Sequence, residues 1–219
     1  MREARAVDLG LVDYRHAWDL QRRLVERRAA EEIPDILLLL EHAHVITLGR
    51  RGTMEDVLDP SVPVIPVERG GEATYHGPGQ LVGYPIVRLA DRLDVKRYVR
   101  DVEEVLIRAS GSVGLAAGRD ARQSGVWVDG RKLGSIGIAI HRNVTYHGFA
   151  HNVSTDLSYF EKIRPCGFDA SIMTSMEREL GRPVPMADVK DAVAEAFAEV
   201  FDLEVSRDPP DALVDLIPQ

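Results

Sequence analysis

The sequence predicts a mixed α/β (α+β) fold, a single domain in which mixed β-sheets are flanked by helices. Three observations support this prediction. Two long segments show helical periodicity, one segment after position 120 alternates with period two, and helices and strands follow one another irregularly. The irregular order argues against a doubly wound parallel sheet. Because the 219 residues contain no linker or internal repeat, we expect residues 1–219 to form one domain.

The N-terminal part is predicted to form one helix and then three strands. Apolar side chains recur at helical spacing over residues 13–33, and Asp13 is a suitable N-cap. Residues 35–42 and 45–49 are short apolar runs of the kind that form buried strands. Residues 62–71 have the pattern of a further strand that ends in a glycine loop.

The middle of the chain contains the strongest patterns. Residues 94–110 place apolar side chains on one helical face, with Asp94 as the N-cap. Residues 125–140 alternate between apolar and polar, and the Asp-Gly pair at 129–130 is typical of a turn between paired strands. This pattern predicts an antiparallel hairpin, which a third strand over residues 144–153 extends.

The C-terminal part is predicted to be mainly helical. A short helix is expected over residues 156–163, a loop over 164–168, and two further helices over 174–180 and 187–201. The last of these buries a regular apolar stripe, so we expect it to pack on the sheet.

Composition and charge exclude several classes of protein. There are 27 Lys and Arg residues against 35 Asp and Glu, so the net charge of −8 disfavours binding to a nucleic-acid backbone. The longest apolar run, residues 36–40, is far shorter than the ~20 residues of a membrane helix. The N-terminus has no apolar signal core. We therefore expect a soluble, cytoplasmic protein without membrane or nucleic-acid partners.

Residues 69–80 form a glycine-rich segment that also contains an arginine and a histidine. Glycines let backbone N–H groups approach a ligand closely, and Arg69 and His76 can donate hydrogen bonds. The spacing of the glycines does not match a phosphate-binding loop. From the residues alone, a ligand-contacting loop and a plain structural turn both remain open.

Lys132 stands on a strand that is otherwise apolar. Alternation puts it on the same face as Ile136, Ile138 and Ile140. Burial there disfavours the ammonium and lowers the pKa of the lysine, which would make it a usable base near neutral pH. Alternatively, the strand end is exposed and the lysine reaches water.

Cys166 is the one cysteine, so the chain can form no internal disulfide, which suits a reducing compartment. It lies in the segment "RPCGF", whose proline and glycine can present sulfur at a loop tip. It is therefore either a reactive thiol or a small buried apolar side chain. Two histidine pairs, His42 with His44 and His147 with His151, have no third ligand at a recognisable spacing, so we expect no metal site.

Taken together, these segments resemble one family. "LLLLEHAHVITLGR", "RGGEATYHGPGQLVGYPI", "GVWVDGRKLGSIGI", "VTYHGFAHNV" and "IRPCG" closely resemble, in order, the signature segments of the octanoyltransferases, also called lipoate-protein ligase B. The resemblance spans about residues 8–201. It implies a fold like that of the biotin and lipoate protein ligases.

The resemblance also implies roles for individual residues. Cys166 would be the acyl-thioester nucleophile, and Lys132 would lower its pKa and move protons. The substrate-binding residues would be Arg69, Gly70, Gly71, Glu72, Ala73, Thr74, Tyr75, His76, Ser135, Ile136, Gly137, Gly148, Phe149 and Ala150. Two positions depart from the family pattern. His151 stands where leucine is usual, which bears on the polarity of the acyl pocket, and His44 stands where proline or a small residue is common.

The activity implied by the resemblance is an acyl transfer. Octanoate would pass from the thioester of acyl carrier protein to Cys166, and then to a lysine amine on a lipoyl domain. The acceptors would be 2-oxoacid dehydrogenases and the glycine cleavage H protein. No cofactor and no ATP would be needed. Both kinds of partner are typically acidic, so residues 22–28, 50–51 and 96–100 are candidate basic docking clusters, one of which we expect at the mouth of the site.

Two other functions remain open from the sequence. An ATP-dependent lipoate or biotin protein ligase on the same fold would activate a free acid and would not need Cys166. A non-catalytic protein that only binds lipoyl domains would have an unreactive thiol.

Overall fold

The computed structural model describes residues 2–89, 94–165 and 169–213. An eight-stranded mixed sheet forms its centre. The strands in spatial order are β11 (Leu203–Asp208), β1 (Arg2–Val12), β2 (Asp35–His42), β6 (Gln80–Ile86), β10 (Val144–Asn152), β9 (Arg131–His141), β8 (Gln123–Val128) and β7 (Gly118–Asp120). Only β1 pairs in parallel, with both of its neighbours; every other neighbouring pair in this sheet is antiparallel.

A smaller sheet and a set of helices complete the described fold. The smaller sheet consists of β4 (Val64–Pro66), β3 (Val45–Leu48) and β5 (Ala73–His76). The α-helices are α1 (Tyr14–Ala29), α2 (Val95–Ser112), α3 (Met176–Leu180) and α4 (Met186–Phe201). Three short 3-10 helices are η1 (Met54–Asp56), η2 (Leu157–Lys162) and η4 (Ala170–Ile172).

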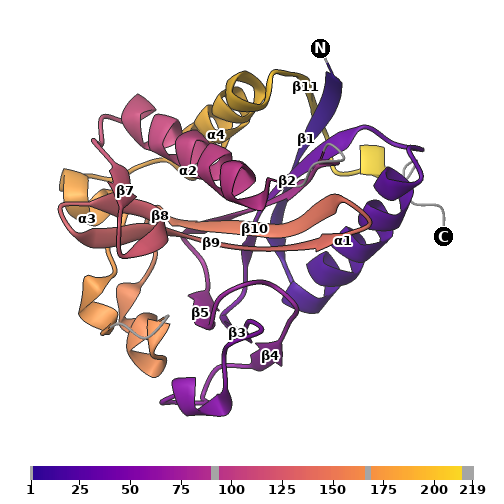
Figure 1. Cartoon of the computed structure of the whole chain (residues 1–219). Coiled ribbons are helices and arrows are strands. Elements are labelled where there is room, and N and C mark those ends of the chain that lie inside the picture. The colour runs from indigo at the N-terminus through magenta and orange to yellow at the C-terminus, as the bar shows by residue number, and fades with distance from the viewer. Residues whose placement is uncertain (1, 90–93, 166–168, 214–219) are drawn as a thin grey trace.

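Helices cover both faces of the large sheet (Figure 1). α2 and α4 lie together on one face, and α1 lies on the other. Strand β2 is buried on both sides, because Leu37 and Leu39 pack under α2 and α4 while Ile36 and Leu38 pack under α1. This explains why its sequence is apolar without alternation. The predicted mixed α/β fold with flanking helices is confirmed.

The predicted helices form where capping and periodicity place them. The Asp13 carboxylate accepts hydrogen bonds from the backbone N–H groups of Arg15 and His16 at the start of α1. Asp94 accepts from the N–H of Arg97 at the start of α2. α1 ends at Ala29, four residues before the predicted end, and the residues predicted as a helix over 156–163 form the 3-10 helix η2.

The hairpin is also confirmed. Both turn residues, Asp129 and Gly130, have positive φ, as does the pair Arg142 and Asn143 that leads into β10. Sequence analysis missed β1 and the edge strand β11, and it took residues 69–80 for a loop, whereas β5 and the start of β6 lie within them. The reason is tertiary: β5 gains its hydrogen bonds from β3, which is distant in sequence.

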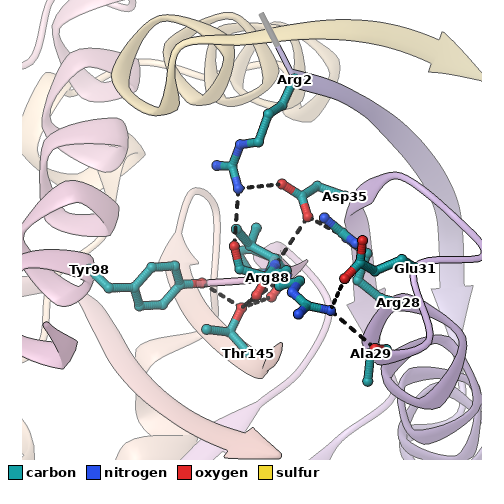
Figure 2. Close-up of polar contacts among 10 residues, drawn as sticks. Arg2, Arg28, Ala29, Glu31, Asp35, Arg88, Tyr98 and Thr145 are labelled. Carbon is teal, nitrogen blue, oxygen red and sulfur yellow. Dashed lines mark hydrogen bonds and ion pairs between the residues drawn. The ribbon is translucent and has the colours of Figure 1, made fainter. Parts of the chain in front are cut away.

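A buried polar cluster joins α2 to the sheet (Figure 2). The Tyr98 hydroxyl of α2 donates to Thr145 Oγ1 on β10 at 3.2 Å, and Thr145 Oγ1 donates to the carbonyl of Pro85 on β6 at 2.8 Å. Tyr98 lies between Val95 and Val99, two residues of α2 that border a cavity. The hydrogen bond to Thr145 therefore holds this part of α2 against the sheet.

Candidate active site

A cavity of about 400 Å³ lies between the N-terminal half of α2, strands β5, β9 and β10, and the segment that precedes β5. Its lining includes exposed side chains, among them Arg51, Val95 and Ser124, which mark the mouth. Its inner end is lined by buried side chains, namely Tyr14, His76, Tyr84 and His147. A volume of this size is within the usual range for small-molecule sites.

Most residues that the sequence nominated for substrate binding line this cavity. They are Arg69, Gly70, Gly71, Thr74, His76, Ser135, Ile136, Gly137, Gly148, Phe149 and Ala150, together with Lys132. Glu72, Ala73 and Tyr75 do not line it. On β5, Thr74 and His76 point to the cavity, so Ala73 and Tyr75 point to the other side, where they pack with Phe160.

Sequence reasoning did not nominate several lining residues. They are Tyr14, Tyr84, Val95, Val99, Gln123 and Ser124. Arg51, by contrast, belongs to the basic cluster at 50–51 that the sequence offered for the mouth of the site. Val95 and Val99 lie one helical turn apart on an amphipathic helix. This spacing was the available signal that one face of α2 lines the cavity. Nothing in the local sequence marks Tyr14, which begins α1, or Gln123, which begins β8.

The segment before β5 and the strand β9 meet backbone to backbone. The N–H of Gly70 donates to the carbonyl oxygen of Ile138 at 2.8 Å. A β-carbon on Gly137 would lie 2.9 Å from the Gly70 carbonyl oxygen and 3.1 Å from Cδ of Arg69. Glycine at position 137 therefore allows this approach, and with it the position of Arg69 in the cavity wall.

Arg69 is buried and makes several hydrogen bonds. Its guanidinium donates to the carbonyl oxygens of Gly70, Glu72 and Thr47 at 2.8 to 2.9 Å, and to Thr47 Oγ1 at 2.8 Å. Since the Thr47 hydroxyl accepts these bonds, its own proton is free to be donated to His76 Nε2, 3.4 Å away. The arginine thereby orders the wall of the cavity as well as contributing its charge.

The same hydrogen-bond chain fixes the tautomer of His76. The Gln80 amide N–H groups donate to the Tyr75 carbonyl at 3.1 Å and to Asn152 Oδ1 at 2.9 Å. Gln80 Oε1 therefore accepts from His76 Nδ1 at 2.8 Å, so the proton of the neutral ring is on Nδ1. Complete burial lowers the pKa of His76 well below its ordinary value. This histidine is a neutral part of the wall at neutral pH.

His42 and two tyrosines support the inner end. His42 Nδ1 donates to the Val12 carbonyl at 2.7 Å, so Nε2 accepts from the Tyr84 hydroxyl, also at 2.7 Å. Burial lowers the pKa of His42 to about 4. Burial also raises the pKa of Tyr14 and of Tyr84 above the ordinary tyrosine range. At neutral pH the rings of His42, Tyr14 and Tyr84 are therefore all uncharged.

His147 lies at the inner end and is 1% exposed. Its backbone N–H donates to Gln21 Oε1 at 2.7 Å, and its Nε2 lies 3.8 Å from Glu68 Oε2. Burial lowers the pKa of His147, although Glu68 opposes this. Burial raises the pKa of Glu68, but contacts with His147 and Trp18 outweigh it and hold that pKa at about 2. This arrangement leaves one carboxylate just behind the inner wall.

The two histidines that depart from the family pattern lie outside the cavity. His151 bonds Ser110 Oγ of α2 at 3.0 Å, and complete burial lowers its pKa to about 3. His44 Nδ1 lies 2.7 Å from the Tyr75 hydroxyl, and its ring stacks on Tyr159 at 4.2 Å between centroids. His151 therefore does not form the wall of the cavity.

Lys132 is buried, with 4% of its surface exposed, so the expectation of burial is confirmed and the exposed alternative is wrong. Its Nζ donates to Gln123 Oε1 and lies 5.4 Å from the Trp127 ring centroid.

The strand that carries Lys132 contains a bulge. Simple alternation is interrupted there, because β9 has an extra residue, Leu133, opposite the step from Val126 to Trp127. Lys132 nevertheless lines the same cavity as Ile136 and Ile138.

Cys166 lies outside the described residues, together with the next two positions. The described chain that follows it reaches Lys132: Met173 forms a parallel bridge with Lys132, and the N–H of Thr174 donates to the Lys132 carbonyl at 3.0 Å. Asn152 Nδ2 donates to the Thr174 carbonyl at 2.9 Å. The segment after Cys166 is thus held on the strand that carries Lys132.

Within the described residues, no three His, Asp or Glu side chains gather closely enough to hold a metal ion. None of the described helices is long and apolar enough to cross a membrane.

Similarity to known proteins is extensive. A family model described as the lipoyl protein ligase A/B catalytic domain matches residues 13–198. The octanoyltransferase of Geobacter metallireducens is 47% identical over 196 residues, covering 89% of this chain and 92% of that relative. The octanoyltransferase of Rubrobacter xylanophilus is 50% identical over 201 residues, covering 88% of this chain and 90% of that relative.

Solved structures with this fold are more distant in sequence. A lipoate-protein ligase A bound with ATP superposes with a TM-score of 0.76 at 16% identity, covering 94% of this chain and 89% of that one. A lipoate protein ligase from Thermoplasma acidophilum, studied with its E2 lipoyl domain, gives 0.73 at 18% identity, covering 95% and 88%. At these identities the likeness shows the fold. The close relatives and the family model show more: this chain belongs to the lipoyl protein ligase A/B catalytic-domain family and, within it, to the octanoyltransferases, which are acyltransferases.

Proposed function

We propose that this protein transfers an octanoyl group from octanoyl-acyl carrier protein, through a thioester on Cys166, to the lysine amine of lipoyl domains. The acceptors are those of 2-oxoacid dehydrogenases and the glycine cleavage H protein, and the reaction takes place in the cytoplasm without a cofactor. The observation that carries the proposal is the buried Lys132 in a cavity lined by apolar side chains, with the segment after Cys166 bridged to its strand.

The first step is an exchange of thioesters. The Cys166 sulfur attacks the octanoyl carbonyl, a new carbon–sulfur bond forms, and the bond to the carrier sulfur breaks. Lys132 takes the proton from the Cys166 thiol and gives it to the departing carrier sulfur, so Lys132 is unchanged at the end. Because one thioester replaces another, the step is nearly isoenergetic and needs no nucleotide.

The second step forms an amide. The neutral amine of the acceptor lysine attacks the acyl-Cys166 carbonyl, a carbon–nitrogen bond forms, and the carbon–sulfur bond breaks. The proton that the amine loses passes through Lys132 to the Cys166 sulfur, which restores the thiol. Burial of Lys132 suits this role, since taking an ammonium out of water is costly and a neutral amine can accept a proton.

The apolar part of the cavity suits the acyl chain. Ile136 and Ile138 of β9 and Val99 of α2 are partly exposed because they face the open cavity. Covering such side chains with a hydrocarbon tail contributes about 0.8 kcal/mol for each buried methylene. Phe149 from β10 adds to the same wall, and its ring packs directly over Gly83.

Intact-protein mass spectrometry tests this function. The enzyme is mixed with octanoyl-acyl carrier protein in the absence of ATP and then with a lipoyl domain. We expect one octanoyl adduct on the enzyme, which disappears as the acceptor gains the same mass. Cys166→Ser should form no thioester adduct, whereas the matched variant Ser171→Ala, in the same part of the chain, should behave like the wild type.

The same experiment separates the two other functions. A ligase that activates free octanoate would modify the acceptor only when ATP and octanoate are supplied, and Cys166→Ser would leave it active. A protein that merely binds lipoyl domains would transfer nothing under either condition. Either result would remove the proposed acyl-enzyme.

A further inference from the structure

A second groove, of about 570 Å³, lies between the first turns of α2 and the strands β7 and β8. It shares four lining residues with the active-site cavity, namely Val95, Val99, Gln123 and Ser124. Ser124 and Val95 are exposed, so the two hollows meet at the surface beside the cavity mouth. A molecule that lies in this groove can therefore reach the cavity along a continuous wall.

Two cations of α2 line this groove. Lys96 and Arg100 are one helical turn apart, so their side chains project from the same face. Both side chains are exposed, and neither charged group forms a hydrogen bond or ion pair with the described part of the chain. The backbone carbonyl of Arg100 accepts a hydrogen bond from Arg119 at 3.0 Å. Their charges are therefore available to a partner.

The carboxylates around the groove are already engaged. Glu103 and Glu104 accept hydrogen bonds from Arg119 at 3.0 and 2.9 Å, and Asp120 accepts from Arg122. Elsewhere on the first turns of α2, Asp94 caps the helix and Asp101 pairs with Arg97 at 3.8 Å. The groove lining itself contains three cations, Lys96, Arg100 and Arg119, and two carboxylates, Glu103 and Asp120. Its charge is therefore positive, although the whole chain has a net charge of −8.

The other two basic clusters are different. In the cluster at 50–51, Arg51 lines the cavity but lies 3.6 Å from the Glu72 carboxylate. In the cluster at 22–28, Arg22 pairs with Glu68 at 3.5 Å and stacks over the Trp18 ring at 4.1 Å. Neither of these two clusters lines the groove. The cluster at 96–100 is thus the one that combines unpaired cations with a path into the cavity.

We propose that this groove receives the phosphate-bearing arm of the acyl carrier donor, with Lys96 and Arg100 contacting its phosphodiester. The inference rests on the proposed function. A carrier delivers its thioester at the end of a long, thin arm, and a groove that meets the cavity at its mouth suits such an arm. The acceptor lysine has only a four-carbon stem and needs a short, direct approach instead. Two flexible cations are opposite in charge to a phosphodiester, and both can donate hydrogen bonds to its oxygens.

The test compares three donors in steady-state transfer to a lipoyl domain. Octanoyl-acyl carrier protein has both protein and phosphate, octanoyl-phosphopantetheine has the phosphate alone, and the octanoyl thioester of N-acetylcysteamine has neither. In Lys96→Glu combined with Arg100→Glu, we expect KM to rise about tenfold for the first two donors, with kcat unchanged. KM for the third donor and for the acceptor should not change.

The chain offers a matched control. Arg97→Glu changes the charge of α2 by the same amount as Arg100→Glu, but Arg97 does not line the groove. Arg100→Glu should therefore raise KM for the two phosphate donors, whereas Arg97→Glu should not. Raising the salt concentration should reduce the difference between Arg100→Glu and the wild type, because exposed charges are screened.

Several outcomes would overturn the inference. Unchanged KM for octanoyl-acyl carrier protein would remove the groove from donor binding. An effect on the carrier donor alone would assign the cations to the protein surface of the carrier instead of its arm. A raised KM for the acceptor would make this the lipoyl-domain surface. Failure of the proposed function is distinguishable, because the wild-type enzyme would then accept none of the three donors.

Discussion

Met173 and Lys132 pair in an isolated parallel β-bridge, although they lie far apart in the sequence. The adjacent N–H of Thr174 donates to the Lys132 carbonyl at 3.0 Å and reinforces this contact. The bridge ties the chain that follows Cys166 to the β9 strand. The proposed reaction between Cys166 and Lys132 needs these two parts of the chain to lie close together.

Lys132→Met should make Cys166 less reactive near neutral pH. If the Lys132 amine promotes formation of the thiolate, its removal should move the pH midpoint for alkylation by iodoacetamide upward, toward the value of about 8.5 for an unperturbed thiol. Because Cys166 is the one cysteine, the label reports on it alone. Lys162→Met serves as the control, since Lys162 pairs with Asp59 instead. An unchanged midpoint in Lys132→Met would contradict the proposed pairing.

Gly137→Ala should reduce octanoyl transfer and stability together. The added β-carbon would meet the Gly70 carbonyl oxygen at 2.9 Å and push against Arg69, so the wall of the cavity must shift. Overpacking of this kind costs about 1–3 kcal/mol in the free energy of unfolding. Denaturant titration and the rate of transfer measure the two effects.

The control is Gly111→Ala, at a helical position with open space around it. Alanine there should stabilise the protein by about 0.5–1 kcal/mol without changing transfer. Full activity in Gly137→Ala would show that the contact between Gly70 and β9 does not shape the site.

Acidification below pH 6.5 should destabilise the protein through its buried histidines. Burial lowers the pKa of His42 to about 4 and that of His151 to about 3, and also lowers the pKa of His76 and His147. Between these values and 6.5 the unfolded chain binds protons that the folded chain does not. The free energy of unfolding therefore falls as pH decreases, by up to about 1.4 kcal/mol per pH unit for each histidine.

His151→Leu isolates one of these contributions. The Ser110 hydroxyl still donates to the Leu106 carbonyl at 2.8 Å in this variant, so leucine leaves no donor unpaired there. Urea unfolding from pH 7 to 4.5 should show a shallower loss of stability than in the wild type. His16→Gln, at an exposed position, should leave the slope unchanged. Equal slopes in His151→Leu and the wild type would show that His151 is not neutral in the folded state.

Asp35→Asn should destabilise the protein strongly. The side chain of Asp35 is fully buried and pairs with Arg28 at 2.7 Å and with Arg2 at 3.5 Å (Figure 2). It also accepts from the Arg88 backbone N–H at 3.0 Å. Removing one partner of a buried ion pair costs about 3–5 kcal/mol. Glu32→Gln, which breaks the exposed pair with Arg27, should cost at most about 1 kcal/mol. Similar midpoints of urea unfolding for the two variants would contradict this difference.

The sequence by itself determined the fold class, the helices α1, α2 and α4, and the two turns that organise β8, β9 and β10. These features are local. Capping by Asp13 and Asp94, a helical apolar stripe and the Asp-Gly turn at 129–130 are each decided by neighbouring residues, so they can be read without the rest of the chain. The resemblance to the octanoyltransferases depended on the same kind of local segment.

Only the tertiary structure decided which nominated residues share a cavity. The pairing of β5 with β3 turned a glycine-rich segment into a strand, and its alternation then separated Thr74 and His76 from Ala73 and Tyr75. The extra residue Leu133 interrupts the alternation next to Lys132, so only the assembled sheet shows that Lys132 lines the same cavity as Ile136 and Ile138. Strand pairing and bulges depend on partners that are distant in sequence, so the direction of a side chain on such a strand is fixed only when the sheet assembles.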